Sequence, residues 1–145
     1  MVEINNTTQH KINIARTRRL VDYFLQVYKK QDWEVSVAVI GAARMRRLNA
    51  RYRGIDKTTD VLSFRGGEKM NKFLGEIVIN ISETKKPGKY RSIFGAKKSP
   101  SAVYLFDFLL VHGLLHLIGY NDESEAERQV MINLGRDFLD QFSKR

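Results

Sequence analysis

The stretch SPSAVYLFDFLLVHGLLHLIGYND, residues 99–122, decides the architecture of this chain. An apolar run of this length predicts a helix that is buried on most sides and lies at the centre of the fold. Its two histidines, His112 and His116, are four residues apart, so they lie on one helix face with Cβ atoms about 5–6 Å apart. That separation allows two imidazoles to bind one metal ion.

A third metal ligand is expected just beyond this helix. Gly119 follows His116 by three residues, at a place where a left-handed residue commonly ends a helix, and Asp122 lies on the returning chain. Two imidazoles, one carboxylate and an open fourth position are typical of a catalytic zinc site. A second interpretation stays open, because Asp122 with Glu125, or Asn121 alone, also fits the N-cap of the following helix.

The spacing is similar to the zinc-peptidase motif H-E-x-x-H-x-x-G-x-x-H, in which the Glu after the first His is the general base. That position is Gly113 in this chain. A metal-dependent peptidase would therefore need a base from elsewhere, for example Asp107 or Glu76. We keep a peptidase as an alternative hypothesis.

Hydrophobic periodicity outside this stretch predicts strands and further amphipathic helices. The strands are expected at residues 10–14, 33–41, 60–64 and 74–81, and the helices at residues 15–31, 42–52 and 123–142. Together with the two-histidine helix they predict one α+β domain over residues 1–145. We expect a small mixed sheet of about four strands with helices packed on it.

The composition favours a polyanionic partner. The chain of 145 residues has a formal net charge of +9, and residues 85–98 contain basic side chains and no acidic one. A merely solubilising surface is the alternative interpretation. Because there is no cysteine, disulfides, thiolate nucleophiles and Cys-ligated metals are excluded, and a metal must be held by His, Asp or Glu. No segment predicts a signal peptide or a membrane span, so we expect a cytoplasmic protein.

Two motifs resemble those of the YbeY endoribonuclease (rRNA maturation factor) family of bacteria. They are LNARYRGIDKTTDVLSF at residues 48–64, followed by LGEIVIN, and VHGLLHLIGYND at residues 111–122. The resemblance covers most of residues 48–131 and implies a zincin-like arrangement around the two-histidine helix. Thr58 and Arg65 stand where the family usually has prolines.

The resemblance also implies a set of site residues. The family's three metal-binding histidines correspond to His112, His116 and position 122, where this chain has Asp122. Carboxylate oxygen binds zinc at about 2.0–2.2 Å, but as a harder ligand it lowers the preference for zinc over metals such as manganese. The family's arginine corresponds to Arg53, whose guanidinium is suited to a phosphodiester. Without the resemblance, nothing distinguishes Arg53 from the neighbouring arginines.

By this resemblance the chain is expected to be a zinc-dependent endoribonuclease specific for single-stranded RNA. The expected catalytic residues are Arg53 and His112. The implied role is in rRNA processing, namely 3′-end maturation of small-subunit rRNA, and in ribosome quality control, with the ribosome or its small subunit as partner. A non-catalytic ribosome- or RNA-binding protein with a structural metal is the further alternative.

Overall fold

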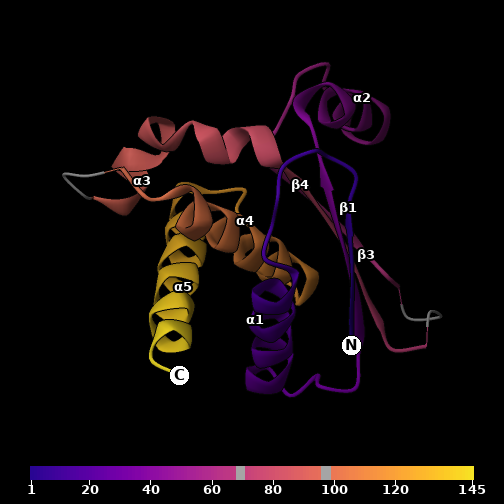
Figure 1. Cartoon of the computed structure of the whole chain (residues 1–145), viewed down its shortest axis with the longest axis vertical. Coiled ribbons are helices and arrows are strands. Elements are labelled where there is room, and N and C mark those ends of the chain that lie inside the picture. Colours follow the sequence, from indigo (N-terminus) through magenta and orange to yellow (C-terminus); the bar gives the residue numbers. More distant parts are fainter. Residues whose placement is uncertain (68–70, 96–98) are drawn as a thin grey trace.

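The computed structural model describes residues 1–67, 71–95 and 99–145, and shows a four-stranded sheet with helices on both faces (Figure 1). The strands are β1 (Val2–Asn6), β2 (Glu34–Ile40), β3 (Val61–Arg65) and β4 (Phe73–Asn80). Their spatial order is β1-β2-β4-β3. Strands β1, β2 and β4 are parallel, and β3 is antiparallel to β4. The predicted α+β class with a small mixed sheet is confirmed.

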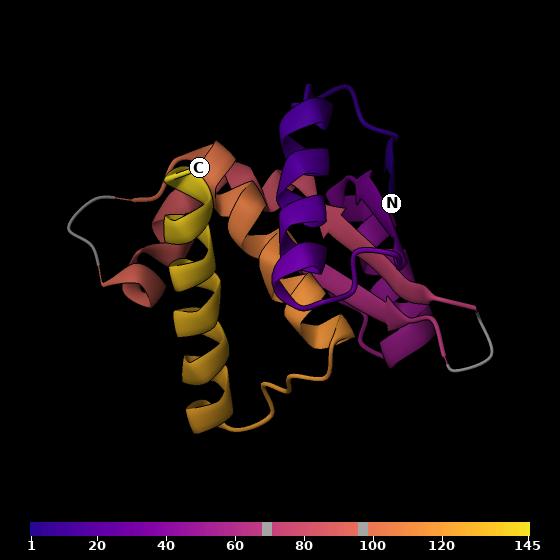
Figure 2. The same cartoon turned by 90° about the horizontal axis from the view of Figure 1, so that it is seen from below.

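Helices α1 and α4 cover one face of this sheet, α5 packs on α4, and α2 covers the other face. In the two views, α1 and α4 lie beside one face, α5 lies along the outer side of α4, and α2 lies on the far side (Figures 1 and 2). The helices are α1 (Ile14–Val27), α2 (Ala42–Arg53), α3 (Arg91–Phe94), α4 (Ala102–Leu117) and α5 (Glu125–Ser143), with two 3-10 segments, η1 (Ile81–Lys85) and η2 (Pro87–Tyr90).

Side chains that point alternately to the two faces of β4 explain how two hydrophobic clusters form. Ile77 and Ile79 are fully buried in the large core beneath α1 and α4. Val78 points the other way, into a small cluster that includes Met45 of α2. Because successive strand residues face opposite sides, Glu76 lies on the face of α2, away from α4.

The strand expected at residues 10–14 is wrong. The first strand is β1, which pairs with β2 along its whole length, whereas residues 10–13 are irregular. The Asn6 side chain accepts hydrogen bonds from the Thr8 amide and hydroxyl, which turns the chain, and Asn13 then caps α1. Strand β1 was not predicted from the sequence because its alternate residues are polar and exposed, which is common in an edge strand.

The other expected elements are present with shifted ends. Helix α1 ends at Val27, earlier than expected, and Lys29 beyond it has a φ of 58°. The expected loop before β4 and the basic segment 85–98 fall partly on residues 68–70 and 96–98, which lie outside the described residues. Among the helices that the structure describes, none has both the length and the apolar character needed to cross a membrane.

Candidate metal centre

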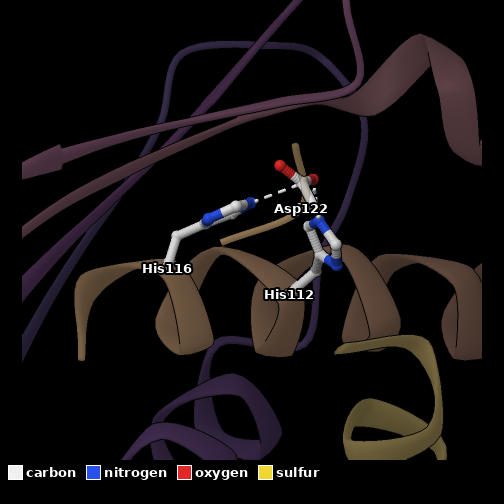
Figure 3. A group of neighbouring side chains, drawn as sticks. All are labelled: His112, His116 and Asp122. Carbon is white, nitrogen blue, oxygen red and sulfur yellow. Dashed lines mark hydrogen bonds and ion pairs between the residues drawn. The ribbon is translucent and has the colours of Figure 1, made fainter. Parts of the chain in front are cut away.

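Helix α4 places both predicted histidines on one face. The rings of His112 and His116 project together from its C-terminal half (Figure 3). Their centroids are 4.8 Å apart, and their planes are nearly perpendicular, at 84°. Their side chains are 15% and 24% exposed, whereas most of the helix around them is fully buried. The two imidazoles are therefore held by the core yet remain accessible.

The end of α4 turns the chain back towards these rings. The Tyr120 amide donates to the Leu115 carbonyl and the Gly119 amide donates to the His116 carbonyl, both at 3.1 Å, which is a Schellman motif. Gly119 has a φ of +113°, a region that L residues rarely adopt. The predicted helix-ending role of Gly119 is confirmed, and the turn directs Asp122 towards the histidines.

The Asp122 carboxylate completes the cluster. Its Oδ2 lies 3.3 Å from Nε2 of His112 and 3.3 Å from Nε2 of His116. One potential ligand atom from each of the three residues lies within 4.8 Å of the others. Two imidazole nitrogens and a carboxylate oxygen form a donor set that suits zinc and neighbouring divalent metals.

The alternative role of Asp122 or Asn121 as a helix cap is wrong. Ser124 caps α5, and its hydroxyl accepts a hydrogen bond from the Glu127 amide at 3.1 Å. The Glu127 carboxylate in return accepts from the Ser124 amide at 3.1 Å, which completes a capping box. The Asp122 side chain is therefore not needed to begin α5.

Hydrogen bonds around His116 leave its Nε2 available as a ligand atom. Its Nδ1 lies 3.0 Å from the Tyr120 carbonyl oxygen. Because a carbonyl only accepts, Nδ1 donates this hydrogen bond, and Nε2 is the ring nitrogen that is directed at Asp122. Arg65 donates from Nε and Nη2 to the His116 carbonyl at 3.3 and 3.2 Å, so it fixes this end of α4.

At His112 and Asp122 the surroundings shift the pKa values in the direction that metal binding requires. Burial lowers the pKa of His112, and the adjacent His116 lowers it further, which favours the neutral imidazole. Burial raises the pKa of the Asp122 carboxyl, but the two histidines lower it more, so the net pKa is below the ordinary value. Neutral imidazoles and an ionised carboxylate are the forms that bind a metal ion.

A small cavity of about 150 Å³ opens beside the cluster and contains residues that the sequence did not single out. One is Asp60, whose Oδ1 accepts from the Val61 amide at 2.8 Å and whose Oδ2 accepts from the Tyr90 hydroxyl at 3.0 Å. Another is Arg128 of α5. These side chains come from segments far apart in the chain, so no spacing rule indicated them. The lining comprises Asp60, Tyr90, Ile93, Phe108, Leu109, His112, Asp122, Arg128 and Ile132.

The structure does not bring Arg53 into this cavity. Arg53 is the exposed last residue of α2, and Gly54 follows it with a φ of +70°. It is absent from the described residues that line the cavity beside His112. Its catalytic role stays a prediction that rests on the resemblance.

None of the general bases considered for a peptidase lies at the metal cluster. Position 113 has no room for a glutamate, and Asp107 and Glu76 have other partners. A Cβ at Gly113 would lie 2.8 Å from Cγ2 of Ile77, so α4 leaves no room there for a glutamate. Asp107 is buried and forms an ion pair with Arg16 at 2.6 Å. Glu76 lies on the opposite face of the sheet, where it accepts a hydrogen bond from the Ser36 hydroxyl.

Comparisons with known proteins identify the family of this chain. A family model described as endoribonuclease YbeY matches residues 3–143. The chain is 30% identical over 152 residues to endoribonuclease YbeY of Geobacillus sp. (strain WCH70), covering 97% of this chain and 92% of that protein. It is 31% identical over 140 residues to endoribonuclease YbeY of Acholeplasma laidlawii (strain PG-8A), covering 95% of each.

The fold has a counterpart among solved structures. A solution structure from Thermotoga maritima matches with a TM-score of 0.59 and 21% identity, covering 99% of this chain and 93% of that one. That likeness supports the fold alone, whereas the family match and the relatives support the activity. The chain therefore belongs to the endoribonuclease YbeY family, and this membership supports an endoribonuclease role in rRNA processing.

Proposed function

We propose that RNA hydrolysis by this chain depends on one divalent metal ion, zinc in the first instance, held by His112, His116 and Asp122. The observation that carries the proposal is the convergence of three ligand atoms within 4.8 Å of one another. The hydrogen bond from His116 Nδ1 to the Tyr120 carbonyl supports it, because metal-binding histidines commonly hold their second nitrogen in this way. Asp122 in place of a third histidine makes manganese a second candidate.

The substrate proposed is single-stranded rRNA, with 3′-end maturation of small-subunit rRNA and ribosome quality control as the cellular roles. The ribosome or its small subunit would then be the partner, and the cytoplasm the location. The net charge of +9 supports a polyanionic substrate. The cations are partly neutralised by acids, since Arg46 pairs with Asp56 at 2.8 Å and Lys89 pairs with Glu83 at 3.2 Å. Phosphate binding is therefore expected to fall on a subset of the basic residues.

A divalent ion at this site would supply Lewis acidity, which activates water near neutral pH and offsets charge on the phosphoryl oxygens. Arg128, which lines the same cavity as His112, is proposed to bind the phosphodiester through its planar guanidinium. Arg53 is proposed to stabilise charge that develops on the phosphoryl oxygens.

Asp60 is the proposed proton acceptor. It is the carboxylate that shares the described cavity with Asp122, and the Val61 amide and Tyr90 hydroxyl fix its orientation. A fixed carboxylate beside the attacking water can take its proton at a carboxylate oxygen. We propose that His112 contributes to catalysis by holding the metal.

Metal analysis combined with a cleavage assay tests the proposal. The purified protein should contain about one equivalent of metal, cut single-stranded RNA, and lose this activity in EDTA until zinc or manganese is restored. Asp122→Ala should lose both metal and activity. Glu123→Ala, which removes the adjacent exposed acid, should keep both. RNA that is retarded on a gel but stays intact with or without EDTA would indicate a binding protein, and digestion of denatured casein would indicate a peptidase.

A further inference from the structure

Strand β3 packs against α4 beside the helix face that carries both histidines. The Ser63 hydroxyl donates to the Gly113 carbonyl at 3.2 Å, and Arg65, on the same face of the strand, donates to the His116 carbonyl. Because His116 follows Gly113 by three residues, the two positions lie about 60° apart around the helix. The side chains that β3 directs at α4 therefore reach as far as one of the proposed metal ligands.

The guanidinium of Arg65 is anchored through one of its edges. Its Nε and Nη2 both donate to the His116 carbonyl, at 3.3 and 3.2 Å. The outer edge, formed by Nη1 and the second N–H of Nη2, has no acceptor among the described residues. This edge presents two parallel N–H groups, a geometry that binds two oxygens of a phosphate. Arg65 is exposed, so a ligand can approach it from solvent.

No acidic side chain in the described part of the chain compensates the charge of Arg65. Arg16 and Arg46 form ion pairs with Asp107 and Asp56, at 2.6 and 2.8 Å. Arg65, in contrast, donates to a neutral carbonyl. A cation that is already held in one orientation loses less conformational freedom on binding an anion than a mobile surface side chain does. Arg65 is therefore a preorganised site for an anionic group.

We propose that Arg65 binds a phosphate of the RNA backbone next to the phosphate that is hydrolysed. The N–H groups of its outer edge donate to the non-bridging oxygens of that phosphate. Arg65 lies at the turn that returns the chain to Asp122, with Nη2 4.0 Å from where a Cβ at Gly119 would be. The proposal rests on the proposed function and adds a point at which the RNA strand is held beside the metal centre. The family's arginine corresponds to Arg53 and its usual residue at position 65 is proline, so family membership does not assign this role.

RNA binding by the full-length protein, measured after EDTA treatment, tests this role. Arg65→Gln removes the charge but keeps an N–H donor, and it should weaken binding of single-stranded RNA about tenfold, which corresponds to about 1.4 kcal/mol. The slope of log K against log salt should become less steep by about 0.7, as expected for the loss of one phosphate contact. Arg65→Lys keeps the charge without the planar fork and should have an intermediate affinity.

Arg18→Gln is the matched control. Arg18 is also an exposed arginine that donates to a backbone carbonyl, that of Val2 at 2.7 Å, but it contacts β1 at the opposite edge of the sheet. The control variant should keep the RNA affinity of the wild type. Equal losses in both variants would show that general electrostatics explains the effect, and they would overturn the proposal.

A neutral linkage placed at successive positions of a short RNA strand locates the contact. A methylphosphonate at the contacted position should weaken binding to the wild type, whereas Arg65→Gln should show no further loss there, because the contact has already been removed. We expect that position to lie next to the linkage that the metal-loaded protein cuts. Independent losses from Arg65→Gln and from the neutral linkage at every position would contradict a direct contact.

Zinc affinity separates phosphate binding from a role in positioning His116. If Arg65 contacts the RNA, Arg65→Gln should keep the zinc affinity of the wild type while its RNA affinity falls. A joint loss of zinc and RNA affinity would make Arg65 a positioning residue and overturn the proposal.

The outcome is also separable from that of the proposed metal mechanism. If the protein bound no zinc but Arg65→Gln still removed one phosphate contact, the phosphate site would stand without that mechanism. If metal-dependent cleavage were observed and Arg65→Gln bound RNA as the wild type does, the mechanism would stand and the phosphate site would fall.

Discussion

The two ends of α4 hold polar side chains in opposite ways. Near its N-terminus, Asp107 is almost inaccessible and is paired with Arg16, which lies 91 residues away in the chain. Near its C-terminus, His112 and His116 stay partly exposed, and both face Asp122, at most ten residues away. One helix thus carries a long-range ion pair that joins it to α1 and a local cluster that is directed at a ligand.

This contrast predicts that one end of α4 stabilises the fold, whereas the other end is the proposed metal site. Removing one partner from a buried ion pair leaves an uncompensated charge, so the Arg16 pair contributes to folding as long as both partners remain. The local cluster brings two imidazoles and a carboxylate together at the end of a helix, with one ligand atom of each within 4.8 Å of the others, where a metal ion is proposed to bind. Substitutions at the two ends should therefore have different effects.

The largest effect is expected from His116→Ala. Loss of an imidazole ligand should release the metal and lower RNA cleavage on the order of 10³-fold or more, because the metal supplies several kcal/mol of transition-state stabilisation. Metal content by elemental analysis and single-turnover cleavage measure this. A variant that retains metal and cleaves normally would remove the functional distinction between the two ends.

Arg53→Ala tests whether the metal cluster suffices for catalysis. A guanidinium that acts on the reacting phosphate contributes about 2.7–4 kcal/mol to the activation free energy, so the cleavage rate should fall about 10²–10³-fold with little change in RNA affinity. Arg51→Ala is the matched control. Arg51 lies two residues earlier on α2, about 200° away around the helix, and stacks on Tyr52. Equal losses in both variants would refute the role of Arg53.

Arg16→Met addresses the folding end of α4. It should lower the free energy of unfolding by about 2–4 kcal/mol, somewhat less than for a fully buried pair, because the Arg16 side chain is 35% exposed. Arg46→Met breaks an exposed pair with Asp56 and should cost at most about 1 kcal/mol. Urea denaturation gives both values. Zinc affinity of the folded Arg16→Met protein should be unchanged, and a large loss of zinc affinity would show that the two ends of α4 are coupled.

Among His116→Ala, Arg53→Ala, Arg16→Met and Gly119→Ala, the last should produce the smallest change. It affects the turn that directs Asp122. A residue with a Cβ at φ +113° costs about 1–3 kcal/mol of stability, and relaxation of the turn should also weaken zinc binding. Gly54→Ala also places an L residue at a positive φ, here +70° at the end of α2, where no atom lies within 4 Å of the added Cβ. It should lower stability without altering zinc affinity. Equal zinc affinities in the two variants would show that the Gly119 turn does not position the ligand.

The parts that were predictable from sequence are those set by short spacings. The interval between His112 and His116 predicts a common helix face, and Gly119 predicts the end of α4. The alternation of Ile77 and Ile79 predicts β4 and its buried face. In each case the structure follows from helix or strand geometry within a few residues.

The start of α5 could not be determined from sequence in the same way. Asp122 with Glu125 and Ser124 with Glu127 present the same capping pattern in two registers. In the structure, Ser124 and Glu127 form the capping box. The side chain of Asp122 is then engaged by His112 and His116 on the preceding helix, a contact that the capping pattern does not indicate.

The residues that line the cavity beside His112 could not be predicted from the sequence, for a related reason. Asp60 precedes β3, Tyr90 ends η2, and Arg128 belongs to α5. The packing of β3 and α5 against α4 brings Asp60 and Arg128 beside His112, and the Tyr90 hydroxyl joins them through its hydrogen bond to Asp60. The ion pair between Arg16 and Asp107 depends in the same way on how α1 packs against α4. Such contacts depend on the tertiary arrangement and leave no periodic signal in the sequence.

The lack of a side chain at Gly113 has an evolutionary consequence. Ile77 and Ser63 of the sheet occupy the space that any larger residue would need, with atoms 2.8 and 3.2 Å from where its Cβ would lie. Substitution of Gly113 by glutamate would therefore disrupt the packing between α4 and the sheet before the new carboxylate could act as a general base. A lineage with this packing would have to change at least two positions together to acquire a glutamate at this point of the motif. This one route to the zinc-peptidase motif is thus opposed by a steric barrier, independently of selection on the metal ligands themselves.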